Sequence, residues 1–336
     1  MDGFIKRRQQ GFLQRRSIIR NLLEIENNML VLSCTSEDSA AVFLDFAAAF
    51  PSIDQEFVIA TLVEFGVPEP EINFIRAIYS SSACNISLQG GSYGGFPMEA
   101  GVRQGCPLSP LIYALVAELL MDKIEAEFDS ILVKAYADDT ALVMRHFFRD
   151  SPRLAELFDE FAQISGLKLN LSKSVIVPLN AFGAKTFHIR RDQATPRWKD
   201  MPIRDHCKYL GFYIGPGKGT RSWEGPYKKF CERLKLWSSM PLGLNWDAKI
   251  YNMFLIPTLG YVAQIESPPE WVLQGIKDLL PLAAKGPHEW ASNEDLWQLQ
   301  EAFGLKTSFK KWTYWRRQLS PGSYTSTGLA PPRDSF

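Results

Sequence analysis

The first part of the chain alternates short apolar runs with apolar residues at helical spacing. Between Ile18 and Leu30, apolar residues recur at three- and four-residue intervals, which predicts a helix within the first 39 residues. The continuous apolar run 40–44 predicts a buried strand that ends at Asp45. Proline-containing turn signals then introduce two further helices, which we expect over 54–65 and 70–81.

The pattern continues as an alternation of helices and strands. Four glycines punctuate residues 84–99 and predict a hairpin. Asp138 and Asp139 lie between two short apolar runs, which predicts two strands joined by an acidic turn. The elements expected after the hairpin are a helix from about 109 to 128, strands over 131–136 and 140–144, a helix over 152–165 and a strand over 174–178.

The pattern changes after residue 215. Glycines and prolines cluster over 211–226, and all nine tryptophans lie in the second half of the chain. Amphipathic spacings predict helices over 226–238, 246–260, 269–283 and 292–303. We therefore predict a boundary near 215, between an α/β domain and a mostly helical one. The last ~15 residues are rich in Ser, Thr, Gly and Pro and predict a frayed tail.

Charge is balanced in total but unevenly distributed. The 37 basic and 37 acidic residues give a net charge of zero, and 46% hydrophobic residues are enough for a sizeable core. Residues 1–20 carry six bases and one acid, residues 21–180 carry nine bases and 22 acids, and residues 190–249 carry 13 bases and six acids. An acidic middle is typical of a solvated surface or of carboxylates around metal ions. Basic flanks suit a polyanion.

Cysteine usage and hydropathy indicate an intracellular protein. The five cysteines are odd in number and form no CxxC pair, so we expect reduced thiols rather than a disulfide framework or a zinc knuckle. The N-terminus lacks the apolar region of a secretory signal peptide. No run of ~18 uncharged apolar residues occurs, so no membrane association is expected. We predict a nuclear or cytoplasmic location.

Three carboxylates are candidates for a metal site. Asp45 ends an apolar strand, and Asp138 and Asp139 are adjacent in a turn between two apolar strands. Adjacent acids near a buried hairpin repel each other and lose hydration, which is costly. Two Mg²⁺ ions bound by carboxylates from two strands would offset that cost and support an in-line phosphoryl displacement. The alternative is an ordinary β-turn, in which Asp is common.

The segments that contain these acids, and several other segments, resemble the motifs of a known family. Residues 43–50 and 136–139 resemble motifs A and C of reverse transcriptases, and residues 101–110 resemble motif B in the form found in non-LTR (LINE-type) retrotransposons. In the same way, residues 165–173 resemble motif D, residues 208–211 resemble motif E, and residues 10–17 resemble the element before motif A. Six elements in the family's order cover about residues 8–215. The chain thus resembles the reverse transcriptase domain of a LINE-type element, truncated at its N-terminus.

The resemblance implies an α/β fold, with an α+β palm, in a right-hand polymerase architecture. Partial fingers would occupy 1–39, the palm with motifs A to E would occupy 40–215, and a helical thumb with the C-terminal tail would occupy 216–336. The implied activity is an RNA-directed DNA polymerase that extends a DNA primer 3′-hydroxyl with dNTPs on an RNA template. It would use two Mg²⁺ ions, with Mn²⁺ as an alternative. The resemblance says nothing of oligomeric state.

The resemblance also assigns roles to individual residues. Asp45 and Asp138 would bind both metal ions with support from Asp139, and the Phe46 carbonyl would complete the nucleotide-side site. Phe50 would be the aromatic steric gate that disfavours a 2′-hydroxyl, although an ordinary core phenylalanine is the alternative.

Further assignments concern the nucleotide, the leaving group and the primer. Lys173 would protonate the pyrophosphate leaving group, unless it is a solvated lysine. The residues expected near the incoming nucleotide are Arg103, Gln104 and Gly105, with a surface salt bridge as the alternative for Arg103. The residues expected in the primer grip are Tyr209, Leu210 and Gly211.

The sequence departs from the family pattern in ways that leave other functions open. Ala48 stands where the family commonly has lysine, Pro51 where it has aspartate, and Arg15 where it has glycine. The upstream fingers strands are also expected to be missing. A catalytically inactive remnant that keeps the palm fold and only binds nucleic acid is therefore the second hypothesis. A viral RNA-directed RNA polymerase palm is a third, which Phe50 disfavours because it leaves no room for a ribose.

Overall fold

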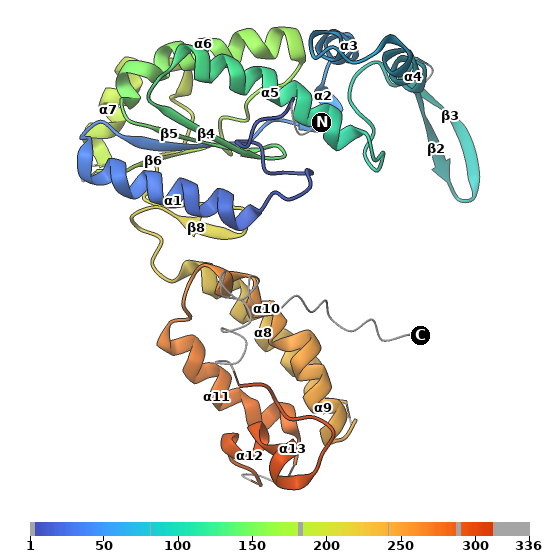
Figure 1. The fold of residues 1–336 in the computed structure, drawn as a ribbon, viewed down its shortest axis with the longest axis vertical. Coiled ribbons are helices and arrows are strands. Elements are labelled where there is room, and N and C mark those ends of the chain that lie inside the picture. The colour runs from blue at the N-terminus through green and yellow to red at the C-terminus, as the bar shows by residue number, and fades with distance from the viewer. Residues whose placement is uncertain (1–3, 81, 181–183, 241, 287–289, 312–336) are drawn as a thin grey trace. The chain divides into compact units, whose positions relative to one another are not determined.

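The computed structural model describes residues 4–80, 82–180, 184–240, 242–286 and 290–311 (Figure 1). Contacts within the chain divide it into two compact units. The first comprises the described residues up to Leu210 together with Ile214–Gly217, and the second comprises Gly211–Tyr213 and the described residues from Lys218 onward. The predicted tail lies outside the described residues.

A four-stranded antiparallel sheet organises the first unit. Its strand order is β4-β5-β1-β6, with bounds Ile131–Tyr136, Asp139–Met144, Ala40–Leu44 and Val175–Pro178. All five residues of β1 are buried because this strand lies between β5 and β6. Strand β4 lies at the edge, and its residues alternate between buried and half-buried. The strands predicted from the apolar runs are confirmed.

Helices cover both faces of this sheet. Helices α5 (Ser109–Glu127) and α6 (Phe147–Ser165) lie over one face, and α1 (Ile18–Thr35) lies over the other (Figure 1). Burial of both faces explains why the central strand is continuously apolar rather than alternating. The predicted α/β fold is confirmed.

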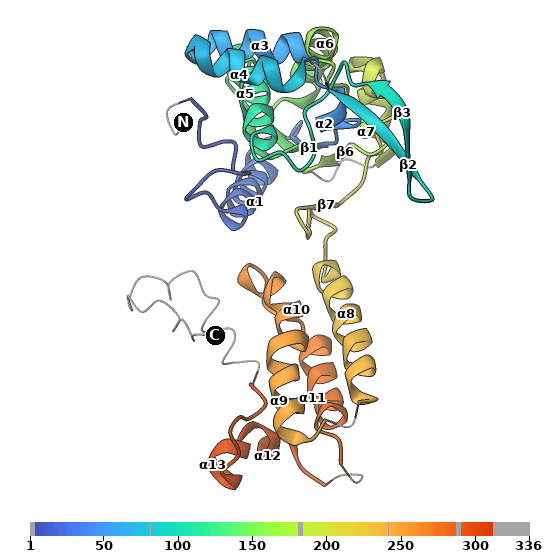
Figure 2. The ribbon, with the colours of Figure 1, turned by 90° about the vertical axis from the view of Figure 1, so that its right-hand side faces the viewer.

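Shorter elements complete the first unit. Helices α2 (Ala49–Ser52), α3 (Gln55–Glu64) and α4 (Glu69–Tyr79) precede the hairpin of β2 (Ala83–Leu88) and β3 (Gly91–Pro97). This hairpin projects from the rest of the unit in both views (Figures 1 and 2). The later elements are α7 (Ala184–Ala194), the 3₁₀ turn Pro196–Trp198 and strand β7 (Cys207–Tyr209), which pairs with β8 (Phe212–Ile214), a strand whose residues are divided between the two units. The predicted hairpin and the helices before it are confirmed.

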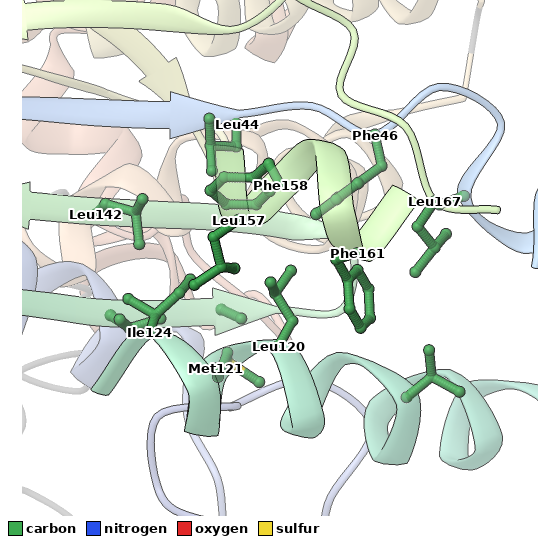
Figure 3. Close-up of a cluster of buried hydrophobic side chains, with 14 of the residues drawn as sticks. Leu44, Phe46, Leu120, Met121, Ile124, Leu142, Leu157, Phe158, Phe161 and Leu167 are labelled. Carbon is green, nitrogen blue, oxygen red and sulfur yellow. The ribbon is translucent and has the colours of Figure 1, made fainter. Parts of the chain in front are cut away.

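The hydrophobic core lies between the sheet and the two helices α5 and α6. Figure 3 shows apolar side chains from both helices that point toward side chains of β1 and β5. The labelled members from these four elements include Leu44, Leu120, Ile124, Leu142, Leu157, Phe158 and Phe161, all of which are buried. This core anchors the strand ends from which the candidate acids project.

From Lys218 onward, the described part of the second unit is mainly helical, and Figure 2 shows α8, α9 and α11 side by side. The bounds are α8 Arg221–Ser238, α9 Leu244–Ile250, a π-helical turn Tyr251–Leu255, α10 Pro257–Gly260, a 3₁₀ turn Val262–Gln264, α11 Glu270–Ala284, α12 Asn293–Trp297 and α13 Leu299–Phe303. Within the described part of the chain, no helix combines the length and the apolar character needed to cross a membrane.

Two predicted helices of this unit are interrupted. The expected helix 246–260 widens into a π-helical turn, in which the Ile256 N–H bonds to the Tyr251 carbonyl. The next residue, Pro257, has no N–H to continue the ladder, and apolar periodicity does not reveal such a break. The expected helix 292–303 divides at Gln298 into α12 and α13.

Two other helices begin earlier than predicted. Helices α6 and α8 start five residues before Pro152 and Pro226, where the pattern placed their first residues. In α6, the buried ring of Phe147 packs against Phe187 and Trp198, with ring centroids 5.3 and 6.4 Å away. This packing extends the helix beyond the start that proline suggested. Helix α7, which carries Phe187, has no clear apolar stripe and was not predicted.

Arg8 forms a buried ion pair with helix α5. Its guanidinium lies 2.7 Å from Glu118, both side chains are almost fully buried, and it also contacts Asp122 and Glu125. Removing one partner leaves an unpaired buried charge, so we expect Arg8→Met to lower the free energy of unfolding by about 3–5 kcal/mol. Urea denaturation measures this loss. Arg153→Met, which removes exposed ion pairs, is the control and should leave the free energy of unfolding almost unchanged. Equal losses of stability in Arg8→Met and Arg153→Met would contradict the prediction.

Candidate active site

The backbone of Asp45 is held from both sides. The residue follows strand β1 directly, and its N–H donates to the Ser174 hydroxyl at 3.1 Å. Its carbonyl accepts the N–H of Asn170 at 2.7 Å. The segment between α6 and β6 therefore holds the backbone of Asp45, whose side chain is half-buried.

Asp138 and Asp139 lie at the turn between β4 and β5. Tyr136 pairs with Asp139, which leaves Ala137 and Asp138 as a two-residue turn. Ala137 has a φ of +59°, in the left-handed region that favours glycine, so the turn is strained. Both acids are exposed at the surface of the unit.

The sheet brings the three acids together. The pairing of Leu44 with Thr140 places Asp45 beside Asp139 on the neighbouring strand. Although Asp139 is exposed as a residue, protein surrounds its carboxyl group closely enough to remove part of its hydration. This loss, together with the charges of Asp138 and Asp45, raises the pKa of Asp139 to about 6.

These acids have the donor chemistry of a magnesium site. Among the described residues, no three His, Cys, Asp or Glu side chains are close enough to form a complete metal cluster. Mg²⁺ is usually bound by one or two carboxylates, with substrate phosphates and waters completing its octahedron. Mutually repelling carboxylates at the end of a strand fit that arrangement.

Phe50 lies in a stack of aromatic rings close to the acids. Its ring is parallel to that of Tyr113, with centroids 5.1 Å apart, and the ring of Phe12 approaches it edge-on at 6.5 Å. Burial, with smaller contributions from the charges of Asp138 and Asp139, raises the pKa of Tyr113, which therefore lies near the acidic turn. Phe50 itself is half-buried.

The motif B segment packs against the turn that carries Phe50. The Val102 N–H donates to the Phe50 carbonyl at 2.8 Å. Gly101 has a φ of +87°, and a Cβ there would lie 2.6 Å from the Pro51 carbonyl oxygen. Only glycine permits this approach, which couples the two segments.

The remaining motif B residues differ in their surroundings. The Arg103 guanidinium donates to the Ile78 carbonyl at 3.0 Å and to the Ser82 hydroxyl at 2.5 Å, so it ties this loop to α4 and the residues after it. Gln104 and Gly105 are exposed, and Gly105 has a φ of +85°. The contact of these three residues with a nucleotide stays a prediction.

The cysteines, all five of which are free, offer a chemical probe of this region. The backbone N–H of Leu108 lowers the pKa of the Cys106 thiol, whereas burial raises the pKa of Cys207 to about 11. Since the thiolate is the nucleophile, we expect iodoacetamide at pH 8 to modify Cys106 faster than Cys207. Mass spectrometry of peptides from a time course measures both rates, and equal rates would contradict the prediction.

Strand β7, which forms a hairpin with β8, lies beside the acidic turn. The two loop residues of this hairpin, Leu210 and Gly211, both have positive φ, as a type I′ turn requires. The Tyr209 hydroxyl donates to the Asp139 carbonyl at 3.1 Å, and its ring lies 5.3 Å from that of Phe43. Tyr209, the first residue of the segment predicted as a primer grip, therefore contacts Asp139.

Phe46 and Lys173 occupy the segments on either side of Asp45. Phe46 pairs with Leu169, and its buried ring lies 6.4 Å from that of Phe158. Lys173 precedes Ser174, its N–H donates to the Asn170 carbonyl at 3.2 Å, and its side chain is exposed.

Sequence reasoning did not select four residues that support this group: Gln9, Tyr113, Asn170 and Ser174. Asn170 and Ser174 hold Asp45, Tyr113 lies against Phe50, and Gln9 bonds to Ala137. A signal was present, since Gln9, Asn170 and Ser174 lie within or directly beside segments that resemble family motifs, and Tyr113 follows the motif B segment by three residues. Their partners, however, are distant in sequence.

Comparisons with known proteins extend over most of the chain. Residues 3–214 match the family model described as reverse transcriptase (RNA-dependent DNA polymerase). The transposon TX1 uncharacterized 149 kDa protein of Xenopus laevis is 26% identical over 82% of this chain and 22% of its own length. The Pol polyprotein of the type-2 retrotransposable element R2DM of Drosophila melanogaster is 26% identical over 81% of this chain and 26% of its own length.

The chain thus spans about a quarter of these two curated relatives. A solved structure of apo telomerase from Candida tropicalis aligns with 84% of this chain and 47% of its own, at 12% identity and a TM-score of 0.47. The family model covers more than half of the chain and includes all the segments that carry the acids and the aromatic stack. The chain belongs to the reverse transcriptase (RNA-dependent DNA polymerase) family.

Proposed function

We propose that this chain is the polymerase core of a reverse transcriptase, which extends a DNA primer on an RNA template with dNTPs. Residues 1–39 would supply partial fingers, residues 40–215 a palm, and residues 216–336 a helical thumb with the C-terminal tail. The single observation that carries the proposal is the meeting of Asp45, Asp138 and Asp139 at one end of the sheet of a chain from this family.

Asp45, Asp138 and Asp139 would hold two Mg²⁺ ions, for which Mn²⁺ can substitute. When bound, the ions make the primer hydroxyl more acidic and neutralise charge on the leaving pyrophosphate. The protein supplies positioning: the bonds from Ser174 and Asn170 fix Asp45, and the β4–β5 turn fixes the other two acids.

The surrounding residues would select and orient the substrates. Phe50, supported by Tyr113, would close the space beside the sugar against a 2′-hydroxyl. Gln104 and Gly105 would face the nucleotide, with Arg103 holding their loop. Tyr209, Leu210 and Gly211 would steady the primer end, and exposed Lys173 would donate a proton to pyrophosphate. The basic stretch 190–249 would meet nucleic-acid phosphates.

Primer extension tests the proposal. The purified chain is incubated with an RNA template, an annealed DNA primer, dNTPs and Mg²⁺ or Mn²⁺, and the products are resolved on a denaturing gel. Extension directed by the template sequence is expected. A DNA template and rNTPs, tested in parallel, define the template and substrate class. The absence of extension with either ion would reject the activity.

The alternative is a remnant that binds nucleic acid without catalysis. Its motivation is the departure from family residues at Ala48, Pro51 and Arg15. It predicts binding to a primer–template duplex that weakens with salt and does not require the acidic residues. Fluorescence anisotropy across a salt series, performed beside the extension reaction, separates the two functions.

A further inference from the structure

The strained acidic turn depends on one buried side chain from the start of the chain. The Gln9 side-chain oxygen accepts the Ala137 N–H at 2.9 Å, and its amide nitrogen donates to the Ala137 carbonyl at 3.2 Å. The same oxygen accepts the Gly11 N–H at 2.9 Å. Gln9 is fully buried. One side chain therefore satisfies both backbone groups of the residue that precedes Asp138.

The orientation of the Gln9 amide follows from its partners. Two backbone N–H groups meet one end, which must be the oxygen, and a carbonyl meets the other, which must be the nitrogen. The Gln9 amide thus makes the hydrogen bonds that a further strand beside the edge strand β4 would make. Without it, the N–H and carbonyl of buried Ala137 would lose these partners.

The segment around Gln9 is itself fixed against β4. The Gln10 N–H donates to the Ala135 carbonyl at 2.8 Å, and the Ala135 N–H donates to the Arg8 carbonyl at 2.9 Å. Gly11 approaches so closely that a Cβ would lie 2.4 Å from the Ala137 nitrogen. Residues 8–11 are therefore held by hydrogen bonds to β4 and pack closely against the turn.

We propose that Gln9 is a positioning residue, which holds the Ala137 backbone and so sets the placement of Asp138 and Asp139 for metal binding. The φ of +59° at Ala137 is unfavourable for alanine, so the turn requires outside support to keep this conformation. Because Gln9 supplies that support, its loss lets the turn relax and separates the carboxylates from their ion-binding geometry. This inference rests on the proposed polymerase function for its catalytic consequence.

Hydrogen–deuterium exchange tests the contact without reference to activity. In Gln9→Met, which has similar length but forms no such hydrogen bonds, the amides of Gly11 and Ala137 should exchange faster than in the unaltered protein. Gln9→Glu keeps an acceptor oxygen and should retain protection of both amides, while it loses the donor to the Ala137 carbonyl. Unchanged exchange of the Ala137 amide in Gln9→Met would overturn the proposal.

Metal affinity tests the consequence. Electron paramagnetic resonance of free Mn²⁺ during a titration gives the dissociation constant, which Gln9→Met should raise by about 10- to 100-fold, as expected for an outer-shell partner of a metal ligand. Extension should require more Mg²⁺ to reach half of its maximal rate. Unchanged Mn²⁺ affinity, despite faster Ala137 exchange, would overturn the positioning role.

Asn252 offers a matched control in the second unit. Its amide likewise donates to a carbonyl, that of Ser308, and accepts an N–H, that of Lys310, both at 2.9 Å. Asn252→Leu should lower stability without a change in Mn²⁺ affinity. If the unaltered protein binds Mn²⁺ but extends no primer, the polymerase proposal fails while the role of Gln9 stands. If it binds no Mn²⁺, the role of Gln9 in metal binding is overturned, whatever the exchange rate of the Ala137 amide.

Discussion

Replacement of Asp138 by asparagine is expected to reduce primer extension by at least about 10³-fold, because an amide does not supply the negative charge that two divalent ions require. Asp138 lies in the two-residue turn between β4 and β5, and its charge acts on Asp139. The substitution preserves side-chain shape, so it should leave the fold intact. Single-turnover extension on an RNA template measures the loss of rate.

The control for this variant is Asp159→Asn, which changes an exposed acid on helix α6. Its extension rate should equal that of the unaltered protein. Binding of primer–template, measured in the absence of divalent ions, should be equal in all three proteins. Retained extension by Asp138→Asn would show that this acid is not a metal ligand and would remove the main support for the catalytic proposal.

Replacement of Phe50 by valine is expected to admit ribonucleotides. The Phe50 ring is stacked on Tyr113, and the ring of Phe12 meets it edge-on. We expect these two rings to stay in place in the variant, so that the smaller valine leaves open space beside the sugar. Loss of one steric contact in an apolar pocket changes selectivity by about 10- to 200-fold. The ratio of kcat/KM for a dNTP to that for the matching rNTP should fall by this factor.

Phe57→Val is the matched control for the Phe50 variant. Phe57 is also a half-buried phenylalanine, and its ring meets Phe161 edge-on at 5.7 Å in the core below α3. Its truncation should lower stability by a comparable amount without a change in sugar selectivity. Equal selectivity changes in both variants would indicate a general loosening of the unit, and unchanged selectivity in Phe50→Val would leave Phe50 as a packing residue.

Much of the fold was predictable because local pattern and tertiary burial agree. The run 40–44 is apolar at every position, and it forms the central strand with both faces covered. The acidic turn follows from two apolar runs separated by polar residues. The predicted starts of α6 and α8 were wrong because the packing of residues such as Phe147 outweighs a proline signal.

The pairing between strands brings together residues whose proximity the sequence did not show. The acids at 45 and 139 come together because Leu44 pairs with Thr140, a register that no local pattern specifies. The interruption before Pro257 depends similarly on which carbonyl the Ile256 N–H reaches.

The family, the order of strands and helices along most of the first unit, and the identity of the candidate acids all follow from the amino-acid sequence. These depend on residue type and spacing, which are local properties. The support of Ala137 by Gln9 and the packing of Tyr113 against Phe50 became visible only in the folded chain. The partners in the first pair are 128 residues apart. Contacts over such separations arise from sheet register and helix packing, so they leave no periodic trace in the chain.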